Sequence, residues 1–407
     1  MNVIVVTIAD LPEGGGNTYY LRMTVRALVL AGHQVTIWNE HALGIAPPDV
    51  LRPEGDWEGG HYRYALGTTS RSSGFGSISE KLRAVRIMAQ WLEAAHREGR
   101  ADVIWFNNLT FYDTWWLTRK ARKLGIATIQ FYQDERQELV SRGSRSLSRR
   151  LFALNSWLGD KWCPRQADAL IVVSSYLKEK YGKVVPKTAR IHMLATIVDC
   201  DRWKCPPEAE GEIPQVLYAG AFGEQDELEG LVDALGVLKQ RGRSFRAVLL
   251  GDNKRDAARM SSIRQQIQRL GISDCVEMPG FVAWDEVRRQ IGKSHILINI
   301  RRDDAWSHSG FSVKLGEYLA SARSVVATTV GDVGSFLKDG ESAVLLKPGP
   351  SPQEIGVALE SVLTSSTKRR QIGEAGWNVA KQHFDLPVAA RILNDALNDA
   401  VRNSQSQ

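Results

Sequence analysis

Long apolar runs and cysteine are scarce in this sequence. No apolar run approaches the roughly 18 residues that span a bilayer, and residues 1–10 lack the basic start of a secretory signal peptide. The four cysteines are Cys163, Cys200, Cys205 and Cys275. Their spacing is not that of metal ligands, so we expect reduced thiols and no metal site. These absences predict a cytoplasmic protein, still able to touch a membrane surface.

A strong charge of either sign is also missing. The net charge is +6, from 52 basic and 46 acidic side chains in 407 residues, which is too mild to indicate a nucleic acid partner. The excess is local, because residues 119–165 hold 11 basic and four acidic side chains. A polyanion or membrane partner is therefore a hypothesis for that segment alone, and we expect no nucleic acid partner.

Neither a dinucleotide-binding fingerprint nor a P-loop occurs. Gly14-Gly15-Gly16 is not G-x-G-x-x-G, and Lys followed by Ser or Thr is missing, which argues against a dinucleotide dehydrogenase. The expected strand 3–8, this glycine turn, the expected helix 19–31 and the expected strand 34–38 form a right-handed βαβ unit. The glycines either let main-chain amides approach a ligand at a helix N-terminus or form a tight turn without one.

The strand and helix patterns alternate in two series. The first lapses over Thr196–Pro214, and a second begins at Gln215. The fold class expected is therefore α/β, with two Rossmann-like doubly wound domains facing across a ligand cleft. We expect an N-terminal domain at 1–198, a C-terminal domain at 199–385 and a helix at 386–407 that packs back on the N-terminal domain.

A Ser/Gly-rich turn in the second series, at 309–312, leads into a helix that carries Lys314 and Glu317. Free amides of this turn could hold a diphosphate and Lys314 would add charge. Glu317, one turn deeper, could accept hydrogen bonds from a ribose diol. An ordinary capped helix with an exposed Lys/Glu pair explains the spacing equally well, so both interpretations stay open.

Five stretches in order resemble the family 4 glycosyltransferases. They are Gly14–Asn17 with Leu28–Thr36, Leu194–Trp203, Val216–Gly220 with Val248–Asp252, Val276–Val282, and Ser309–Ala320 with Val325–Asp332. The resemblance implies the GT-B fold and retaining transfer from a nucleoside-diphosphate sugar, without a metal or other cofactor. The implied acceptor is a glycan or polyprenyl-linked oligosaccharide. The Tyr218-Ala219-Gly220 and Lys314-x-x-Glu317-Tyr318 forms resemble a branch that assembles surface polysaccharides.

The resemblance also implies a set of donor-binding residues. They are Gly15, Gly16, Gly220, Gly223, Phe281, Val282, Ser309, Gly310, Phe311, Ser312, Lys314 and Glu317. Where the family usually has an Arg and a Lys for the diphosphate, this chain has Ala221 and Asp226, so Lys314 would take over their charge role. This departure leaves two alternatives: a non-catalytic protein that binds a nucleotide-sugar, or a nucleotide-sugar epimerase.

The catalytic candidates are Asp134, His308, Lys314 and Glu317. Asp134 or its neighbour Glu135 follows the expected strand 127–132 and could orient or deprotonate an acceptor hydroxyl. A helix cap or a surface charge is the competing interpretation for these two side chains. His308 lies beside the donor turn in the sequence and is a second candidate base.

The basic segment 142–165 contains an expected amphipathic helix. Leucines and a tryptophan at helical spacing form one face, flanked by arginines; they are Leu147, Leu151, Leu154, Leu158 and Trp162. Such a helix could lie on an anionic membrane surface at the inner face of the cell membrane. The alternative is that the leucine face packs on the sheet of its own domain.

Overall fold

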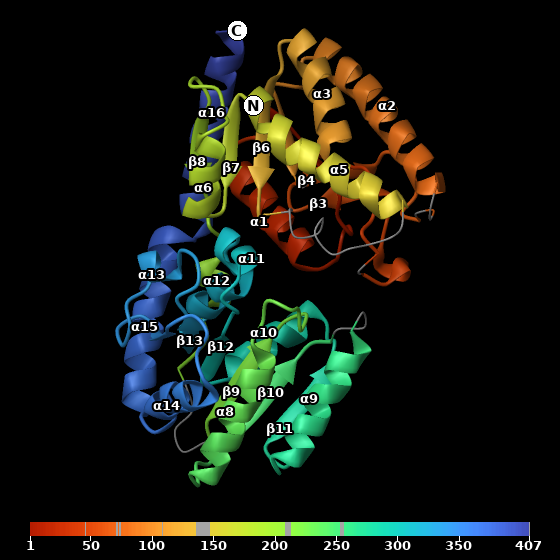
Figure 1. The fold of residues 1–407 in the computed structure, drawn as a ribbon. Coiled ribbons are helices and arrows are strands. Elements are labelled where there is room, and N and C mark those ends of the chain that lie inside the picture. The colour runs from red at the N-terminus through yellow and green to blue at the C-terminus, as the bar shows by residue number, and fades with distance from the viewer. Residues whose placement is uncertain are drawn as a thin grey trace. The chain divides into compact units, whose positions relative to one another are not determined.

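The computed structural model describes residues 1–44, 46–70, 72, 75–107, 109–135, 147–207, 213–252 and 256–406 (Figure 1). The chain forms two compact units. Unit 1 comprises Met1–Ile197 and Leu386–Gln407, and unit 2 comprises Val198–Asp385. Each is a doubly wound α/β structure on its own sheet, so the prediction of two doubly wound α/β domains is confirmed.

Unit 1 is built on an eight-stranded sheet in the order β3-β4-β2-β1-β5-β6-β7-β8. Its strands are β1 (Asn2–Thr7), β2 (Gln34–Asn39), β3 (Glu54–Trp57), β4 (Gly60–Tyr64), β5 (Val103–Asn107), β6 (Ala127–Tyr132), β7 (Ala169–Val172) and β8 (Arg190–Met193). All pair in parallel except β3 and β4. Helices cover both faces of the sheet, so the central strands are continuous apolar runs.

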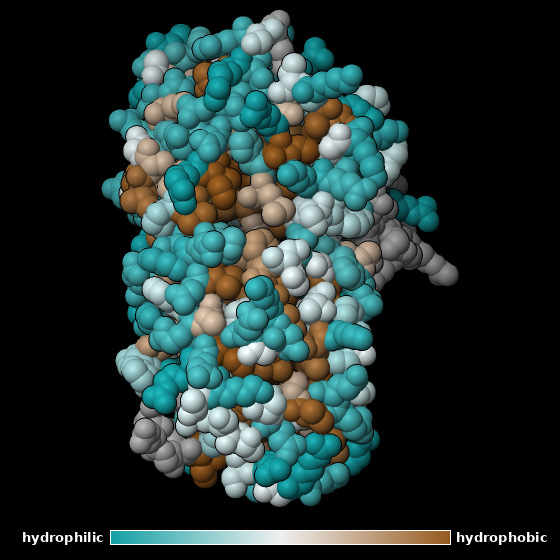
Figure 2. Space-filling view, turned by 90° about the vertical axis from the view of Figure 1, so that its left-hand side faces the viewer, coloured by the Kyte–Doolittle hydropathy of each residue, from teal (hydrophilic) through white to brown (hydrophobic). Residues whose placement is uncertain are grey.

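The helices of unit 1 come from both ends of its sequence. They are α1 (Gly16–Leu30), α2 (Phe75–Arg97), α3 (Phe111–Lys123), α5 (Leu147–Trp162), α6 (Ser175–Gly182) and α16 (Leu386–Gln405), with short 3-10 turns at Pro48–Val50 and Pro164–Gln166. Helix α16 packs against α1 and strands β5 to β8. His192 Nε2 lies 3.0 Å from Asp399 Oδ2, and Asn403 donates to the carbonyl of Asp168. These contacts make α16 part of unit 1. Figure 2 shows the side of the molecule on which α6 and α16 lie, where hydrophobic patches alternate with hydrophilic residues.

Unit 2 is built on a six-stranded parallel sheet in the order β11-β10-β9-β12-β13-β14. Its strands are β9 (Gln215–Ala219), β10 (Arg246–Leu250), β11 (Val276–Gly280), β12 (Ile296–Asn299), β13 (Ser324–Thr328) and β14 (Val344–Leu346). Its helices are α7 (Cys200–Trp203), α8 (Leu228–Gln240), α9 (Ala257–Arg269), α10 (Trp284–Lys293), α11 (Ala305–Ser309), α12 (Val313–Ala320), α13 (Val333–Phe336), α14 (Pro352–Leu363) and α15 (Ser366–His383).

The strand orders place a topological switch point in each unit. In unit 1 the chain leaves β1 toward β2 and later returns to the other side of β1 with β5. In unit 2 it leaves β9 toward β10 and returns with β12. Ligands of doubly wound sheets bind at the carboxyl ends of the strands that flank such a point. The loops after β1, β5, β9 and β12 are therefore where sites are expected.

Two local features were not predicted from the sequence. Strands β3 and β4 form an antiparallel hairpin whose two turn residues, Glu58 and Gly59, have φ of 53° and 85°. This is the backbone of a primed turn, in which Asn is commoner than Glu at the first position. Part of the expected linker instead forms α7, which buries Cys200 and Trp203 in unit 2.

Candidate functional site

The switch point of unit 2 joins the loop after β9 to the end of β12. Asp226 in the loop forms an isolated antiparallel bridge with Arg301, which follows β12. The Thr328 hydroxyl at the end of β13 accepts a 2.9 Å hydrogen bond from the Arg301 amide. Three neighbouring strand ends are thus connected at the position where a ligand of this fold would bind.

Lys314, on α12, points into this switch point. Its Nζ lies 2.7 Å from Asp226 Oδ1 and 4.6 Å from the centre of the Tyr218 ring. The Tyr218 hydroxyl donates to Asp226 Oδ2 at 2.7 Å. The lysine side chain is 23% exposed and the aspartate 11%. The side chains of Asp226 and Lys314 are called the Asp226–Lys314 pair below. The Tyr218 hydroxyl is hydrogen-bonded to this pair at the end of β9.

A second tyrosine fixes α12 to β9. The Tyr318 hydroxyl accepts a 2.9 Å hydrogen bond from the Ala219 amide and donates to the Ala219 carbonyl at 3.2 Å. Burial raises the pKa of Tyr318 well above its ordinary value, so the hydroxyl keeps its proton. The Tyr218-Ala219-Gly220 and Lys314-x-x-Glu317-Tyr318 motifs therefore touch each other.

The glycines of this loop have different surroundings. A side chain at Gly220 would bring its Cβ within 2.5 Å of the Tyr218 hydroxyl and 2.8 Å of Lys314 Nζ. One at Gly251 would meet the Gly220 carbonyl at 1.7 Å, and Gly251 also has φ of 134°. Gly223 has open space around it. Packing within unit 2 thus requires Gly220 and Gly251, whereas Gly223 leaves room for a ligand.

Arg259, on α9, contacts the loop after β9 through two backbone carbonyls. Its role was not identified from the sequence. Its guanidinium donates to the carbonyls of Gly223 at 2.7 Å and Asp226 at 2.9 Å, and it pairs with Glu229 at 2.7 Å. The side chain is 10% exposed. A single arginine in an amphipathic helix gives no sequence signal for this role, because such residues are usually solvated.

The electrostatics of Asp226 follow from its surroundings. Burial alone would raise its pKa, but the charge and hydrogen bond of Lys314, the Tyr218 hydroxyl and the charge of Arg301 hold the pKa below its ordinary value. Asp226 is therefore ionised at neutral pH. Its carboxylate neutralises Lys314, so Lys314 is not an isolated cation in this structure.

His308, a predicted catalytic candidate, uses both ring nitrogens within unit 2. Nε2 lies 2.7 Å from Asp303 Oδ1, and Nδ1 accepts a 3.2 Å hydrogen bond from the Gly331 amide. A ring with Nδ1 as acceptor carries its proton on Nε2. The imidazole thereby links α11 to the loop after β13.

The side chains of the predicted donor turn are also engaged. Ser309 donates to the Trp306 carbonyl at 2.9 Å, and Ser312 donates to Asn299 Oδ1 at 2.9 Å. The Phe311 ring packs against two other phenylalanines, Phe336 and Phe384. A ligand at this turn would therefore meet backbone amides, including those of Gly310, more than hydroxyl groups.

Three other predicted donor-binding residues lie on α12 and after β11. Glu317 is half-buried on α12, one turn after Lys314. Phe281 and Val282 follow β11, which β10 separates from β9. Phe281 is 70% exposed.

The glycine loop of unit 1 follows β1 at the other switch point. Helix α1 begins at Gly16 with Gly15 as its N-cap. A side chain at Gly14 would meet Thr18 Oγ1 at 2.3 Å, whereas Gly16 has open space. Gly14 is thus required by packing, and the open helix N-terminus at Gly15 and Gly16 remains accessible to a ligand.

The two acidic candidates after β6 differ in their contacts. Glu135 Oε1 lies 2.9 Å from Lys180 Nζ, and the Tyr176 hydroxyl donates to its other oxygen. Asp134 is half-buried and makes no hydrogen bond or ion pair with any residue that the structure describes. Of the two, Asp134 is the carboxylate that an acceptor could reach.

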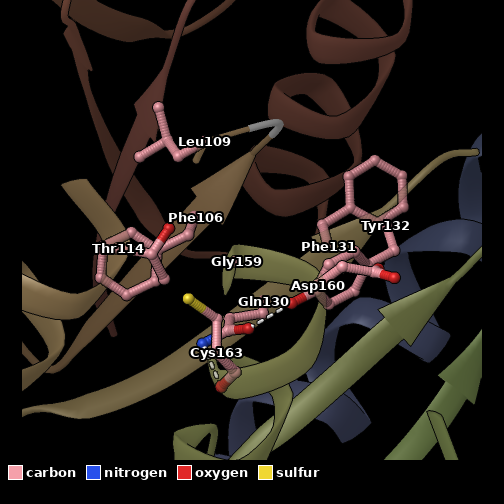
Figure 3. Close-up of a pocket in the computed structure, with 9 residues that line it drawn as sticks. All are labelled: Phe106, Leu109, Thr114, Gln130, Phe131, Tyr132, Gly159, Asp160 and Cys163. Carbon is pink, nitrogen blue, oxygen red and sulfur yellow. Dashed lines mark hydrogen bonds between the residues drawn. The ribbon is translucent and has the colours of Figure 1, made fainter. Parts of the chain in front are cut away.

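A pocket lies beside these residues in unit 1 (Figure 3). Strands β5 and β6 and helices α3 and α5 supply its walls, with the residues Phe106, Leu109, Thr114, Gln130, Phe131, Tyr132, Gly159, Asp160 and Cys163. The Tyr132 hydroxyl donates to Gln130 Oε1 at 2.7 Å, and Gln130 Nε2 donates to the Cys163 carbonyl at 2.8 Å. The polar groups of Gln130 are therefore paired within the wall.

Unit 1 also contains a buried charged network near its switch point. Lys81 Nζ on α2 lies 2.7 Å from Asp113 Oδ2 on α3 and 3.6 Å from Glu40 Oε1, just after β2. Both carboxylate side chains are fully buried. Thr110 accepts hydrogen bonds from Lys81 and from Asn155 of α5, at 2.8 and 2.7 Å. Burial and the charge of Glu40 raise the pKa of Asp113 to about 7, against the opposing effect of Lys81.

Helix α5 exposes two leucines of the predicted apolar face, Leu151 and Leu154, whereas Leu158 is half-buried. Exposed fractions are 46% for Leu151, 51% for Leu154, 41% for Trp157 and 44% for Trp162. The side chains of Leu147 and Arg149 lie outside the described residues. These exposed side chains do not pack on the sheet, so the alternative interpretation of the leucine face fails for them.

The face of α5 that is buried consists of small residues. Ser156 and Gly159 are buried, as is Cys163, which directly follows the helix. A Cβ at Gly159 would lie 2.9 Å from the backbone nitrogen of Phe111, so the absence of a side chain lets α5 approach the start of α3 closely. This close approach explains why the leucine face points away from the domain.

Two features are missing from the part of the chain that the structure describes. No three or more His, Cys, Asp or Glu side chains gather there as they would around a metal ion. Nor does any helix among those residues have the length and hydrophobicity needed to cross a membrane.

Comparison with known families matches each unit. The sequence model of a family described as "Glycosyl transferase 4-like domain" matches residues 14–196, and that of "Glycosyl transferases group 1" matches residues 213–365. A curated relative, alpha-D-kanosaminyltransferase of Streptomyces kanamyceticus, is 23% identical over 244 residues, which are 56% of this chain and 61% of the relative. The chain thus spans about three fifths of the length of the curated relatives it matches.

Solved structures resemble nearly the whole chain. Sucrose-phosphate synthase of Thermosynechococcus elongatus superposes with a TM-score of 0.72 at 16% identity, covering 97% of each chain. The Anabaena protein HepE, solved with UDP and glucose, gives a TM-score of 0.68 at 16% identity, covering 98% of this chain and 99% of that one. At this level of identity the likeness shows the fold.

Proposed function

Because the chain belongs to the family 4-like, group 1 glycosyltransferases, we propose that it transfers a sugar from a nucleoside-diphosphate sugar to a hydroxyl of a glycan or lipid-linked oligosaccharide. Transfer would retain the anomeric configuration. The observation that carries the proposal is the switch point of unit 2, where the two sequence motifs meet around the Asp226–Lys314 pair. Gly223 leaves open space beside that pair.

Each part of the site has a role under this proposal. The diphosphate would lie against the backbone amides near Gly223 and of the turn before α12, where a helix N-terminus favours negative charge. Lys314 would offset charge on the leaving diphosphate, and Glu317 would bind the ribose hydroxyls. Phe281 and Val282 would contact the base.

The reaction would exchange one bond for another at the anomeric carbon. The acceptor oxygen bonds to that carbon as the bond to the diphosphate oxygen breaks, and the acceptor proton passes to a phosphate oxygen of the donor. Asp134 would orient the acceptor hydroxyl from unit 1. The leaving nucleoside diphosphate carries away the electron pair of the broken bond.

Calorimetric titration with UDP, GDP and their glucose and mannose derivatives tests donor binding. We expect one nucleoside diphosphate to bind and Glu317→Ala to weaken its binding by tenfold or more, while Glu341→Ala, an exposed residue of unit 2, leaves binding unchanged. Equal affinities for the unaltered protein and Glu317→Ala would remove the role given to Glu317. NMR of the product with a suitable acceptor would report the anomeric configuration.

Two other functions give different results in the same experiments. A protein that only binds the nucleotide-sugar would neither transfer nor hydrolyse it. An epimerase would change the sugar of the donor without any acceptor, which NMR of the donor alone would detect. We favour transfer because the family match covers both units.

We also propose that α5 lies on an anionic membrane surface and brings unit 1 to a lipid-linked acceptor at the inner face of the cell membrane. Its outer face combines exposed leucines and tryptophans with cations. Lys161 of α5 lies 4.9 Å from the centre of the Trp157 ring, and Arg165, in the 3-10 turn that follows the helix, lies 5.0 Å from that of Trp162. Exposed apolar side chains with adjacent cations are typical of helices that bind anionic interfaces.

Sedimentation with vesicles of phosphatidylcholine and phosphatidylglycerol tests the membrane proposal. We expect binding at low salt, weaker binding at high salt, and loss of binding in the double variant Leu151→Asp, Leu154→Asp. Leu30→Asp is the matched control, because Leu30 is 58% exposed on a different helix of unit 1. No binding at low salt, or equal loss in the control, would contradict the proposal.

A further inference from the structure

The Asp226–Lys314 pair raises a question that the proposed function leaves open. A carboxylate at a diphosphate site repels the ligand, yet Asp226 lies 2.7 Å from the lysine that would bind it. Either Asp226 opposes the ligand, or its effect on Lys314 outweighs the repulsion. The surroundings of the pair distinguish these cases.

Asp226 is held by groups other than the lysine. The Tyr218 hydroxyl donates to Oδ2 at 2.7 Å, while Lys314 contacts Oδ1. Arg259 donates to the Asp226 carbonyl at 2.9 Å, and the Asp226 amide donates to the Gly223 carbonyl at 3.0 Å. These contacts fix the backbone and the side chain of Asp226 independently of Lys314.

Lys314, in contrast, has a long flexible side chain whose direction depends on its partners. Its Nζ lies 2.7 Å from Asp226 and 4.6 Å from the Tyr218 ring centre, on the side of Gly220 where a Cβ would be 2.8 Å away. An ordered lysine loses less side-chain entropy when a ligand binds than a mobile one. A fixed carboxylate can thus improve the lysine as a phosphate ligand.

We propose that Asp226 is a positioning residue that holds the Lys314 ammonium beside the Gly220–Gly223 loop, so that Lys314 binds the phosphates of a nucleoside diphosphate from a fixed position. This inference rests on the proposed function, because it assumes that a nucleoside diphosphate binds at this switch point. It differs from the charge role that the sequence suggests for Lys314, since the lysine then acts only in combination with Asp226.

Calorimetry with UDP and uridine, or with GDP and guanosine if the protein prefers that base, tests the inference. We expect Asp226→Asn and Lys314→Ala each to weaken diphosphate binding about tenfold and to leave nucleoside binding unchanged. The double variant should bind no more weakly than Lys314→Ala, because Asp226 acts through the lysine. Asp226→Glu, which can still reach Lys314, should restore part of the affinity.

A control variant and three contrary results complete the test of the inference. Asp274→Asn removes an aspartate that pairs with Lys239 at 2.6 Å on the surface of unit 2, and it should leave diphosphate binding unchanged. Tighter diphosphate binding by Asp226→Asn would mean that Asp226 opposes the ligand and would overturn the inference. So would additive losses in the double variant, or a parallel loss of nucleoside and diphosphate affinity, which would indicate damage to the fold.

Failure of the proposed function has a separate signature. An unaltered protein that binds no nucleoside diphosphate would overturn both proposals. A protein that binds the diphosphate, with Asp226→Asn as tight as the unaltered chain, would overturn the positioning role alone.

Discussion

Each unit contains a buried aspartate paired with a lysine near its switch point, and the two pairs differ in composition. In unit 2 one lysine, Lys314, serves one carboxylate, Asp226. In unit 1 one lysine, Lys81, serves two fully buried carboxylates, Glu40 and Asp113. The pKa of Asp226 is lowered, whereas that of Asp113 is raised to about 7.

The difference shows that burial alone does not set the direction of a pKa shift. Burial raises the pKa at both aspartates. At Asp226 the charge and hydrogen bond of Lys314, with the Tyr218 hydroxyl, outweigh burial. At Asp113 the second carboxylate adds to burial, and a single ammonium does not compensate. The neighbours of each buried aspartate therefore set the direction of its shift: a second carboxylate beside Asp113, and the Tyr218 hydroxyl and the charge of Arg301 beside Asp226.

Removing the lysine of unit 1 should have the largest effect. Lys81→Met removes the lysine shared by two fully buried carboxylates, Glu40 and Asp113, so we expect the free energy of unfolding of unit 1 to fall by about 3–5 kcal/mol. Urea unfolding followed by tryptophan fluorescence would measure it. Lys183→Met is the control, because its pair with Glu179 is exposed and should not alter the transition. A change as small as that of the control would mean that Lys81 does not stabilise the network.

Removing the lysine of unit 2 should destabilise less. Lys314→Met leaves one carboxylate, which keeps the Tyr218 hydroxyl and the nearby charge of Arg301, so we expect a loss of about 2 kcal/mol. The same urea experiment applies, with Lys338→Met as control, since that lysine is 79% exposed. A loss larger than that for Lys81→Met would contradict the comparison.

The pH dependence should separate the two aspartates by sign. Asp113 has a folded pKa of about 7 against an ordinary 3.8, so the folded state keeps a proton that the unfolded state releases between these values. Stability should therefore fall as pH rises from about 4 to about 7, by at most roughly 1.4 kcal/mol per pH unit. Asp113→Asn should remove this slope in unfolding measured between pH 5 and pH 8.

Asp226 should behave in the opposite way. Its lowered pKa contributes stability at neutral pH, which is lost as pH falls below the ordinary aspartate range. Asp226→Asn should therefore flatten the pH dependence on the acid side only. Identical pH profiles for the two Asn variants would refute the contrast between the units.

The fold followed from the sequence because its strands are buried on both faces. Runs such as Val3–Val6 in β1 and Val216–Ala219 in β9 are fully apolar and are each followed by glycine turns. That pattern is typical of parallel sheets covered by helices. The β3–β4 hairpin escaped prediction because its turn uses Glu58-Gly59 in place of the usual Asn-Gly.

The site could be predicted in part. Motif spacing pointed to Lys314 and Tyr318, which the structure places against Asp226 and Ala219. For Asp226, the sequence indicated only that an aspartate replaces the usual lysine of the family. It did not predict the contact with Lys314, because a sequence shows which residue occupies a position and not which side chain it contacts. The Glu40, Lys81 and Asp113 network was missed for the same reason, since its members come from three separate elements.

Helix α5 shows a different limit of prediction from sequence. Leucines at helical spacing predicted an apolar face but not its direction. The direction is set by Gly159, where the lack of a side chain allows contact with the Phe111 backbone, and by Asn155, which bonds to Thr110. Small and polar residues decide which face is buried, and hydrophobic periodicity does not register them.

The return of α16 to unit 1 has a consequence for synthesis on the ribosome. Helix α16 follows all of unit 2 in the chain, yet it covers α1 and strands β5 to β8 of unit 1. Vectorial folding, in which an N-terminal domain closes before the next one emerges, is therefore incomplete here. The surface of unit 1 that α16 covers therefore stays exposed until the whole of unit 2 has been translated.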